Sequence, residues 1–126
     1  MRFKKIHEDM RGEIAVVLDI LPGDRELTMF TTNKGYARGG CVHRQNGEAC
    51  VVIKGAILYV IGNNEPLNLS CGDTCYIEPN TPHYFVALTN ETVVLEWGAT
   101  EEEKKERDPQ FRHIVDNINE NMGASS

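Results

Sequence analysis

The chain has 126 residues, of which 40% are hydrophobic and 25% are charged, a composition typical of one soluble globular domain and not of a disordered chain. Its net charge of −6 leaves no basic face large enough for a nucleic-acid duplex, so general nucleic-acid binding is disfavoured. The start of the sequence has no apolar stretch of the secretory type, and the longest apolar runs, 14–21 and 56–61, are too short to span a membrane. We therefore expect a cytoplasmic protein whose four cysteines are free thiols.

Most of the chain is predicted to form short strands separated by turn residues. The expected strands are 13–21, 26–32, 36–43, 48–54, 56–61, 67–69, 74–77, 83–88 and 92–97. Strands that start about every 8–12 residues favour an antiparallel sandwich or barrel. Because no strand alternates with a helix, a parallel nucleotide-binding sheet is disfavoured. Phe85 and Trp97 are expected to fill the barrel.

The sequence changes character at Gly98. Thr100 and Glu103 match a capping box, which predicts a charged helix over 101–107 that ends near Asp108-Pro109.

An apolar stripe follows, with side chains that recur at the spacing of one helix face. Its members are Phe111, Ile114, Val115 and Ile118. This helix is expected to lie across the barrel or across a partner subunit. The predicted division of the chain is a β-barrel domain over 1–98, a helical extension over 99–122 and a flexible tail over 123–126.

Side chains that bind metals or transfer protons gather in two segments. Cys41 and His43 are two residues apart on a predicted strand, so both would point into one cavity. A turn at Asn46-Gly47 would bring Glu48 back beside them on the next strand. His83 follows a rigid Pro-x-x-Pro turn and would approach the same place from another hairpin.

These two segments resemble the two motifs of the cupin superfamily, and the resemblance covers residues 25–98. The first motif, H-x-H-x(3,4)-E-x(6)-G, is represented by Cys41, His43, Glu48 and Gly55, with Cys in the place of the first His. The second motif, G-D…P-x-G-x-x-H, is represented by Gly72, Asp73, Pro79, Asn80 and His83, with Asn in the place of the Gly. The resemblance implies an all-β fold, the RmlC-like double-stranded β-helix or jelly roll barrel, here with a short C-terminal α-helix.

One function that the resemblance implies is metal binding. By position, the metal ligands would be Cys41, His43, Glu48 and His83. A thiolate, two imidazoles and a carboxylate suit zinc, or iron with open coordination positions. On this hypothesis the protein is a metal-dependent cupin, either a dioxygenase or an isomerase.

A second resemblance leads to the favoured hypothesis. Residues 34–44 are similar to the K-G…R-G-x-H-x-H-K stretch of the cupin-type dTDP-sugar 3,4-ketoisomerases, which work without a metal. This similarity implies a sugar-nucleotide ketoisomerase or epimerase-like enzyme that requires no cofactor. In such an enzyme an imidazole moves a proton next to a ketone through an enediol, because its pKa lies near neutral pH.

The residue roles on this hypothesis fall into two groups. The catalytic candidates are His43, His83 and Tyr84. The substrate-binding candidates are Arg38, Arg44, Tyr36, Glu48 and Tyr76. A third hypothesis is a cupin-type module that binds a sugar or a small acid without turning it over. On all three, the partner is a small molecule, which is a nucleotide-linked sugar on the favoured one, and we expect a homodimer that binds neither nucleic acid nor membrane.

Overall fold

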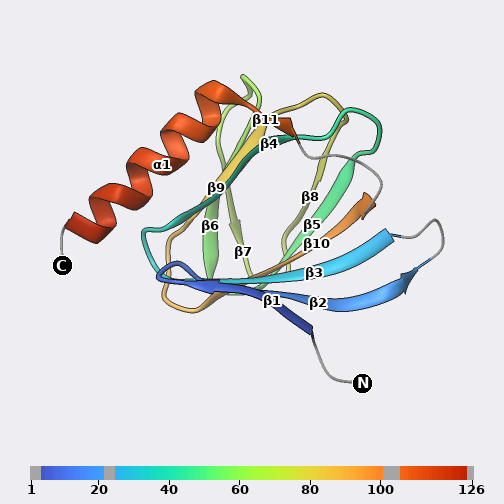
Figure 1. The fold of residues 1–126 in the computed structure, drawn as a ribbon, viewed down its shortest axis with the longest axis horizontal. Coiled ribbons are helices and arrows are strands. Elements are labelled where there is room, and N and C mark those ends of the chain that lie inside the picture. The colour runs from blue at the N-terminus through green and yellow to red at the C-terminus, as the bar shows by residue number, and fades with distance from the viewer. Residues whose placement is uncertain (1–3, 22–24, 101–105, 125–126) are drawn as a thin grey trace.

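Two antiparallel sheets face each other and enclose the core of the protein, and one helix packs beside the smaller sheet (Figure 1). This computed structural model describes residues 4–21, 25–100 and 106–124. The larger sheet contains β1 (Lys4–Asp9), β2 (Gly12–Leu21), β3 (Arg25–Thr32), β5 (Glu48–Lys54), β8 (Thr74–Ile77) and β10 (Thr92–Thr100). The smaller sheet contains β4 (Ala37–Val42), β6 (Ala56–Ile61), β7 (Leu67–Ser70), β9 (His83–Ala87) and β11 (Glu106–Arg107).

The strand order shows how distant segments meet. The larger sheet runs β1-β2-β3-β10-β5-β8 and the smaller sheet runs β11-β4-β9-β6-β7. Alternate side chains of β5, β6 and β9 are buried between the sheets, as expected for strands with one face on the core. The largest fully buried core side chains are Tyr59, Phe85, Ile57, Ile77, Val52 and Val94. The all-β jelly roll that the resemblance implied is confirmed.

All nine predicted strands are present, and β5, β6 and β8 have the predicted bounds. Two strands were not predicted from the sequence, β1 and β11, and the six side chains of β1 are all exposed. Because none of its residues needs burial, β1 has no alternation of apolar and polar residues that could predict it.

The expectation that Trp97 fills the barrel is wrong. Its side chain is 40% exposed, and the Arg25 guanidinium lies 5.4 Å from the centre of its ring. Side chains alternate between the faces of a strand, and on β10 the buried side chains include Thr92 and Val94, which are an odd number of residues from Trp97. Trp97 therefore lies on the outer face, whereas Phe85 is buried as predicted.

The charged helix expected over 101–107 is not found where the structure describes this segment. Thr100 belongs to β10, where it is paired with Arg25. Residues 101–105 lie outside the described residues. Glu106 and Arg107 form β11, which pairs with Val42 and Cys41 at the edge of the smaller sheet. Here pairing with a sheet edge outweighs the local preference for helix.

The C-terminal helix α1 spans Pro109–Ala124. Asp108 and Pro109 begin this helix and do not end a preceding one. The Phe111 N–H donates to the Asp108 carboxylate at 2.9 Å, and Pro is favoured at the first helical position. Gly123 and Ala124 belong to the helix and not to a flexible tail. No helix within the described ranges has the length and apolar character needed to cross a membrane.

The apolar stripe of α1 lies against the barrel of its own chain. Phe111 and Val115 are buried, and the helix packs on β4 and β9 (Figure 1). Asn119 fixes this position, because its side chain accepts a hydrogen bond from Ala37 N at 2.8 Å and donates one to Ala37 O at 3.1 Å.

Candidate functional site

A cavity of about 210 Å³ lies between the two sheets. Its wall contains apolar side chains of both sheets together with charged groups and two imidazoles. The lining residues are Arg11, Ile14, Phe30, Arg38, Gly39, Cys41, His43, Glu48, Tyr59, His83, Phe85, Glu96 and Arg112. Enclosed space of this kind, with a few converging polar groups, is where a small-molecule site is expected.

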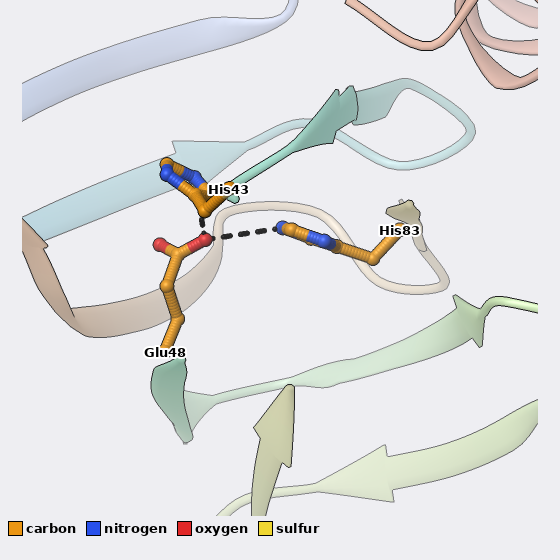
Figure 2. A group of neighbouring side chains, drawn as sticks. All are labelled: His43, Glu48 and His83. Carbon is orange, nitrogen blue, oxygen red and sulfur yellow. Dashed lines mark ion pairs between the residues drawn. The ribbon is translucent and has the colours of Figure 1, made fainter. Parts of the chain in front are cut away.

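Three polar side chains converge at this cavity. His43 Nε2 lies 2.7 Å and His83 Nε2 lies 3.2 Å from the same oxygen of Glu48, Oε1. All three residues are buried, and their potential ligand atoms lie within 4.8 Å of one another. Figure 2 shows both imidazole contacts meeting at one carboxylate oxygen. The convergence of these three groups was predicted from the sequence, but β4 and β5 lie in opposite sheets and are not the neighbouring strands that the expected turn implied.

The backbone that positions the three groups explains the motif residues around them. Asn80 has a φ of 62°, a left-handed conformation that Asn tolerates better than most residues other than Gly. This explains why Asn can stand where the cupin motif has Gly. The Asn80 N–H donates to His43 O at 2.7 Å, which ties the turn before His83 to the end of β4. Glu48 is the first residue of β5.

Gly55 ends the first motif for a steric reason. Its φ is +82°, and a Cβ at this position would overlap Thr89 Oγ1. The turn from β5 to β6 therefore requires a residue without a side chain.

The orientation of His83 fits a site for a cation. Its Nδ1 lies 2.9 Å from Thr81 O. A carbonyl only accepts hydrogen bonds, so Nδ1 carries the proton. In the neutral ring the lone pair of Nε2 then faces Glu48 Oε1, which is also an electron-pair donor. A proton or a metal ion between the two atoms removes the repulsion between their lone pairs. Histidines that bind metals are usually oriented in this way, by a hydrogen bond from the other ring nitrogen to a backbone carbonyl.

The contacts of Glu48 support the same interpretation. Despite the short distances to both imidazoles, Oε1 has no partner in hydrogen-bond geometry, and His43 Nδ1 is likewise buried without one. Two imidazoles and a carboxylate are a donor set used by zinc and by non-haem iron. The residues present therefore fit a divalent transition metal.

The electrostatics of the group favour a bound positive charge. Burial raises the pKa of Glu48, but the His43 and His83 imidazoles outweigh it and hold that pKa well below its ordinary value. Burial lowers the pKa of His83, but the Glu48 and Glu96 carboxylates outweigh it, so the pKa is raised. Glu48 is therefore ionised at neutral pH, and a cation beside it is stabilised.

Arg38 is a buried cation at the same cavity. Its side chain donates to Thr32 Oγ1 at 3.2 Å and to Thr31 O at 3.3 Å, and Nη1 is buried without a partner. Burial lowers its pKa to about 10, so the group stays charged at neutral pH. No carboxylate of the described residues forms an ion pair with it. A buried charge without a counter-ion is costly, so an anionic ligand would be stabilised here.

Four further polar residues of the cavity were missed by the sequence reasoning. Arg11 lies after β1 and is neutralised by Asp9 at 2.7 Å, and Arg112 comes from α1. Tyr59 donates a hydrogen bond to Glu96 at 2.9 Å. These residues lie outside the two motifs, and no sequence signal placed them near the site.

Cys41 lines the cavity, as its spacing predicted. It is not a member of the group of potential ligands formed by the two histidines and Glu48. The ladder between β4 and β9 shifts its register between Gly39 and Cys41. Such a bulge re-aims side chains relative to regular alternation.

The structure does not bring Arg44 and the three tyrosines to this cavity. Arg44 is exposed and pairs with Glu106 at 2.8 Å. Tyr76 is 61% exposed on the outer face of the larger sheet. Tyr84 packs edge-on against Phe111 of α1, and Tyr36 borders a separate surface groove beside that helix. Their expected roles in catalysis and substrate binding therefore have no support from the geometry.

Comparison with solved structures identifies proteins of the same fold. KdgF from Halomonas sp. is 20% identical, with a TM-score of 0.67, and the match covers 79% of this chain and 89% of that one. The capsular polysaccharide assembling protein CapF from Staphylococcus aureus is 14% identical, with a TM-score of 0.71, over 85% of this chain and 32% of that one. An RmlC-like cupin from Shewanella frigidimarina is 14% identical, with a TM-score of 0.62, over 80% of this chain and 86% of that one.

No curated protein matches the sequence. The family model described as "Cupin domain" matches residues 29–98, the range that contains both motifs, the cavity's three converging groups and Arg38. The chain belongs to the cupin family.

Proposed function

We propose that this cupin is a metal-dependent enzyme that acts on a small anionic molecule. The observation that carries the proposal is the buried convergence of His43 Nε2, His83 Nε2 and Glu48 Oε1 in contacts without hydrogen-bond geometry. Zinc or iron would suit this donor set. When bound, such a metal would act as a Lewis acid on a carbonyl or on water.

The chain's own groups divide the remaining work. Glu48 supplies the negative charge that a divalent ion needs, and the bond from His83 Nδ1 to Thr81 O holds that ring in the ligand orientation. Arg38 would bind the anionic group of the substrate, because its Nη1 is buried without a partner. Phe30 and Phe85 form part of the cavity wall and offer apolar surface to the bound molecule.

The size of the cavity is the reason for ranking the metal-free ketoisomerase second. Ligand pockets usually measure about 300–1,000 Å³, whereas this cavity measures about 210 Å³. It would accept a sugar-sized group, and the nucleotide of a nucleotide-linked sugar would have to lie outside it. The observation in favour of the ketoisomerase is the buried His43–Glu48 contact of 2.7 Å, an arrangement in which an imidazole can take up and return a proton.

Metal analysis separates the two functions. We expect protein purified without added metal to contain one transition metal per chain by mass spectrometry, and His83→Ala and Glu48→Gln to lose it. The matched control is His113→Ala, because His113 is exposed on α1 and should leave the metal content unchanged. Absence of metal in the purified protein, together with no binding of added Zn²⁺ or Fe²⁺, would overturn the metal-dependent function.

The metal-free alternative has a test of its own. Incubation with a 4-keto-6-deoxy sugar nucleotide in deuterated water should then place deuterium next to the ketone. His43→Ala should abolish that exchange. A module that only binds would instead hold a small acid or sugar without exchange, and His43→Ala would weaken binding with no rate to lose.

A further inference from the structure

Two of the four cysteines lie directly opposite each other on neighbouring strands. Cys50 of β5 and Cys75 of β8 are register partners in an antiparallel ladder, and both are free thiols. Opposed residues of such a ladder have Cα atoms about 4.5–5.5 Å apart, inside the range of about 4.4–6.8 Å that disulfides span. The register pairing is therefore compatible with a disulfide between these two side chains.

The two thiols are in contact on the inner face of the larger sheet. Cys50 belongs to the buried core, and Cys75 packs against it.

The two thiols differ in their exposure to solvent. Strand β8 forms the edge of the larger sheet, and Cys75 is only partly buried, whereas Cys50 is 3% exposed. A small oxidant would reach Cys75 first and would find Cys50 already in place as the second thiol.

We propose that Cys50 and Cys75 are a reversible redox site that closes to a disulfide with a peroxide as the oxidant. The Cys75 sulfur attacks one peroxide oxygen, the O–O bond breaks, and a sulfenic acid and one water molecule form. The Cys50 sulfur then attacks the sulfenic sulfur and releases a second water molecule as the S–S bond forms. Two thiols are oxidised by two electrons in total, and one peroxide is reduced to two water molecules.

The pair does not line the candidate cavity, but Cys50 lies on the same strand as Glu48. Cys50 and Glu48 are two residues apart on β5 and both are buried, so they share its inner face. Closing the disulfide would tie the strand that carries Glu48 to the edge strand β8.

Peptide mapping of the folded protein tests the site. Cleavage after Arg44, Lys54 and Lys104 releases Cys50 in fragment 45–54 and both Cys71 and Cys75 in fragment 55–104. After treatment with hydrogen peroxide and blocking of the remaining thiols, we expect these two fragments to be linked and the link to disappear with dithiothreitol. The same link should form in Cys71→Ser and should be absent from Cys75→Ser.

The controls distinguish the pair from general thiol reactivity. Cys71 is more exposed than Cys75, so its greater accessibility alone would favour a link through Cys71. Cys75→Ser changes a partly exposed position on an edge strand, so circular dichroism should show that the variant keeps its fold. The peptide map of the wild-type protein is a separate test that needs no variant. A link that is lost in Cys71→Ser, or wild-type fragments that stay unlinked while Cys71 is oxidised, would overturn the assignment.

Discussion

Replacing Glu48 by Gln is the most direct perturbation of the candidate metal site. The substitution preserves the size and shape of the side chain and removes its negative charge. It also leaves the imidazoles of His43 and His83, which contact Oε1 at 2.7 and 3.2 Å, without a carboxylate between them. The expected consequence is a large loss of metal affinity without loss of the fold.

The magnitude follows from the geometry. The potential ligand atoms lie within 4.8 Å of one another. At about 4 Å and an effective dielectric constant of about 20, each pair of unit charges interacts by about 4 kcal/mol. The amide oxygen that Gln retains still offers a weaker ligand, so we expect a net loss of about 3 kcal/mol, or about a hundredfold in dissociation constant.

Competition against a chromophoric chelator measures this change, with Zn²⁺ as the metal. Glu96→Gln is the matched control, because Glu96 lines the same cavity and loses the same charge without belonging to the group of potential ligands. An unchanged affinity in Glu48→Gln, or an equal loss in Glu96→Gln, would refute the reasoning. The first result would mean that Glu48 is not a ligand, and the second that only the total charge of the cavity matters.

Three further predictions follow from the same structure. Metal affinity should fall about tenfold per pH unit once the pH drops below the raised pKa of His83, because a proton then competes with the metal while Glu48 stays ionised. Calorimetry in buffers of different ionisation enthalpy measures this through proton release, and pH-independent binding would contradict it. Arg38→Met should weaken the binding of a small carboxylate about tenfold to a hundredfold, since hydrogen bonds to charged groups contribute about 1.5–3 kcal/mol. Equilibrium dialysis of a labelled keto acid tests this, and equal binding by the variant would exclude Arg38 as the anchor. Gly55→Ala should lower the free energy of unfolding by about 1–3 kcal/mol or more, whereas Gly72→Ala, which shares a positive φ but has no atom near its Cβ position, should cost less. Urea denaturation compares the two, and equal losses would show that the steric overlap is unimportant.

The cupin motifs made the centre of the site predictable because they specify local geometry. His43 directly follows β4 and Glu48 begins β5, and these two strands lie in opposite sheets, so the short connection between them brings the two side chains together. Gly55 and Asn80 mark backbone conformations that few residues adopt, so their positions in the sequence already carry structural information. The strands themselves were predictable from short segments rich in apolar residues that are bounded by turn residues.

Other expectations failed where distant segments compete for the same surface. The charged segment before α1 has the composition of a helix, but Glu106 and Arg107 pair with the open edge of β4. Tyr84 and Tyr76 carry side chains suited to a sugar site. Instead, Tyr84 packs beneath α1, and the alternation of side chains along β8 places Tyr76 on the outer face of the larger sheet. No residue type by itself decides between such alternatives.

Turn chemistry and motif spacing are local properties, so the sequence was enough to predict the cupin fold and the approach of His43, Glu48 and His83. It also predicted that Cys41 would join them, and Cys41 is not in that group of potential ligands. The tertiary structure was needed to show that Arg38 is buried with no ion pair to a carboxylate of the described residues and that Cys50 faces Cys75 across the ladder. These features depend on which strands become neighbours and on how much solvent reaches them. Both are set by the packing of segments far apart in the chain.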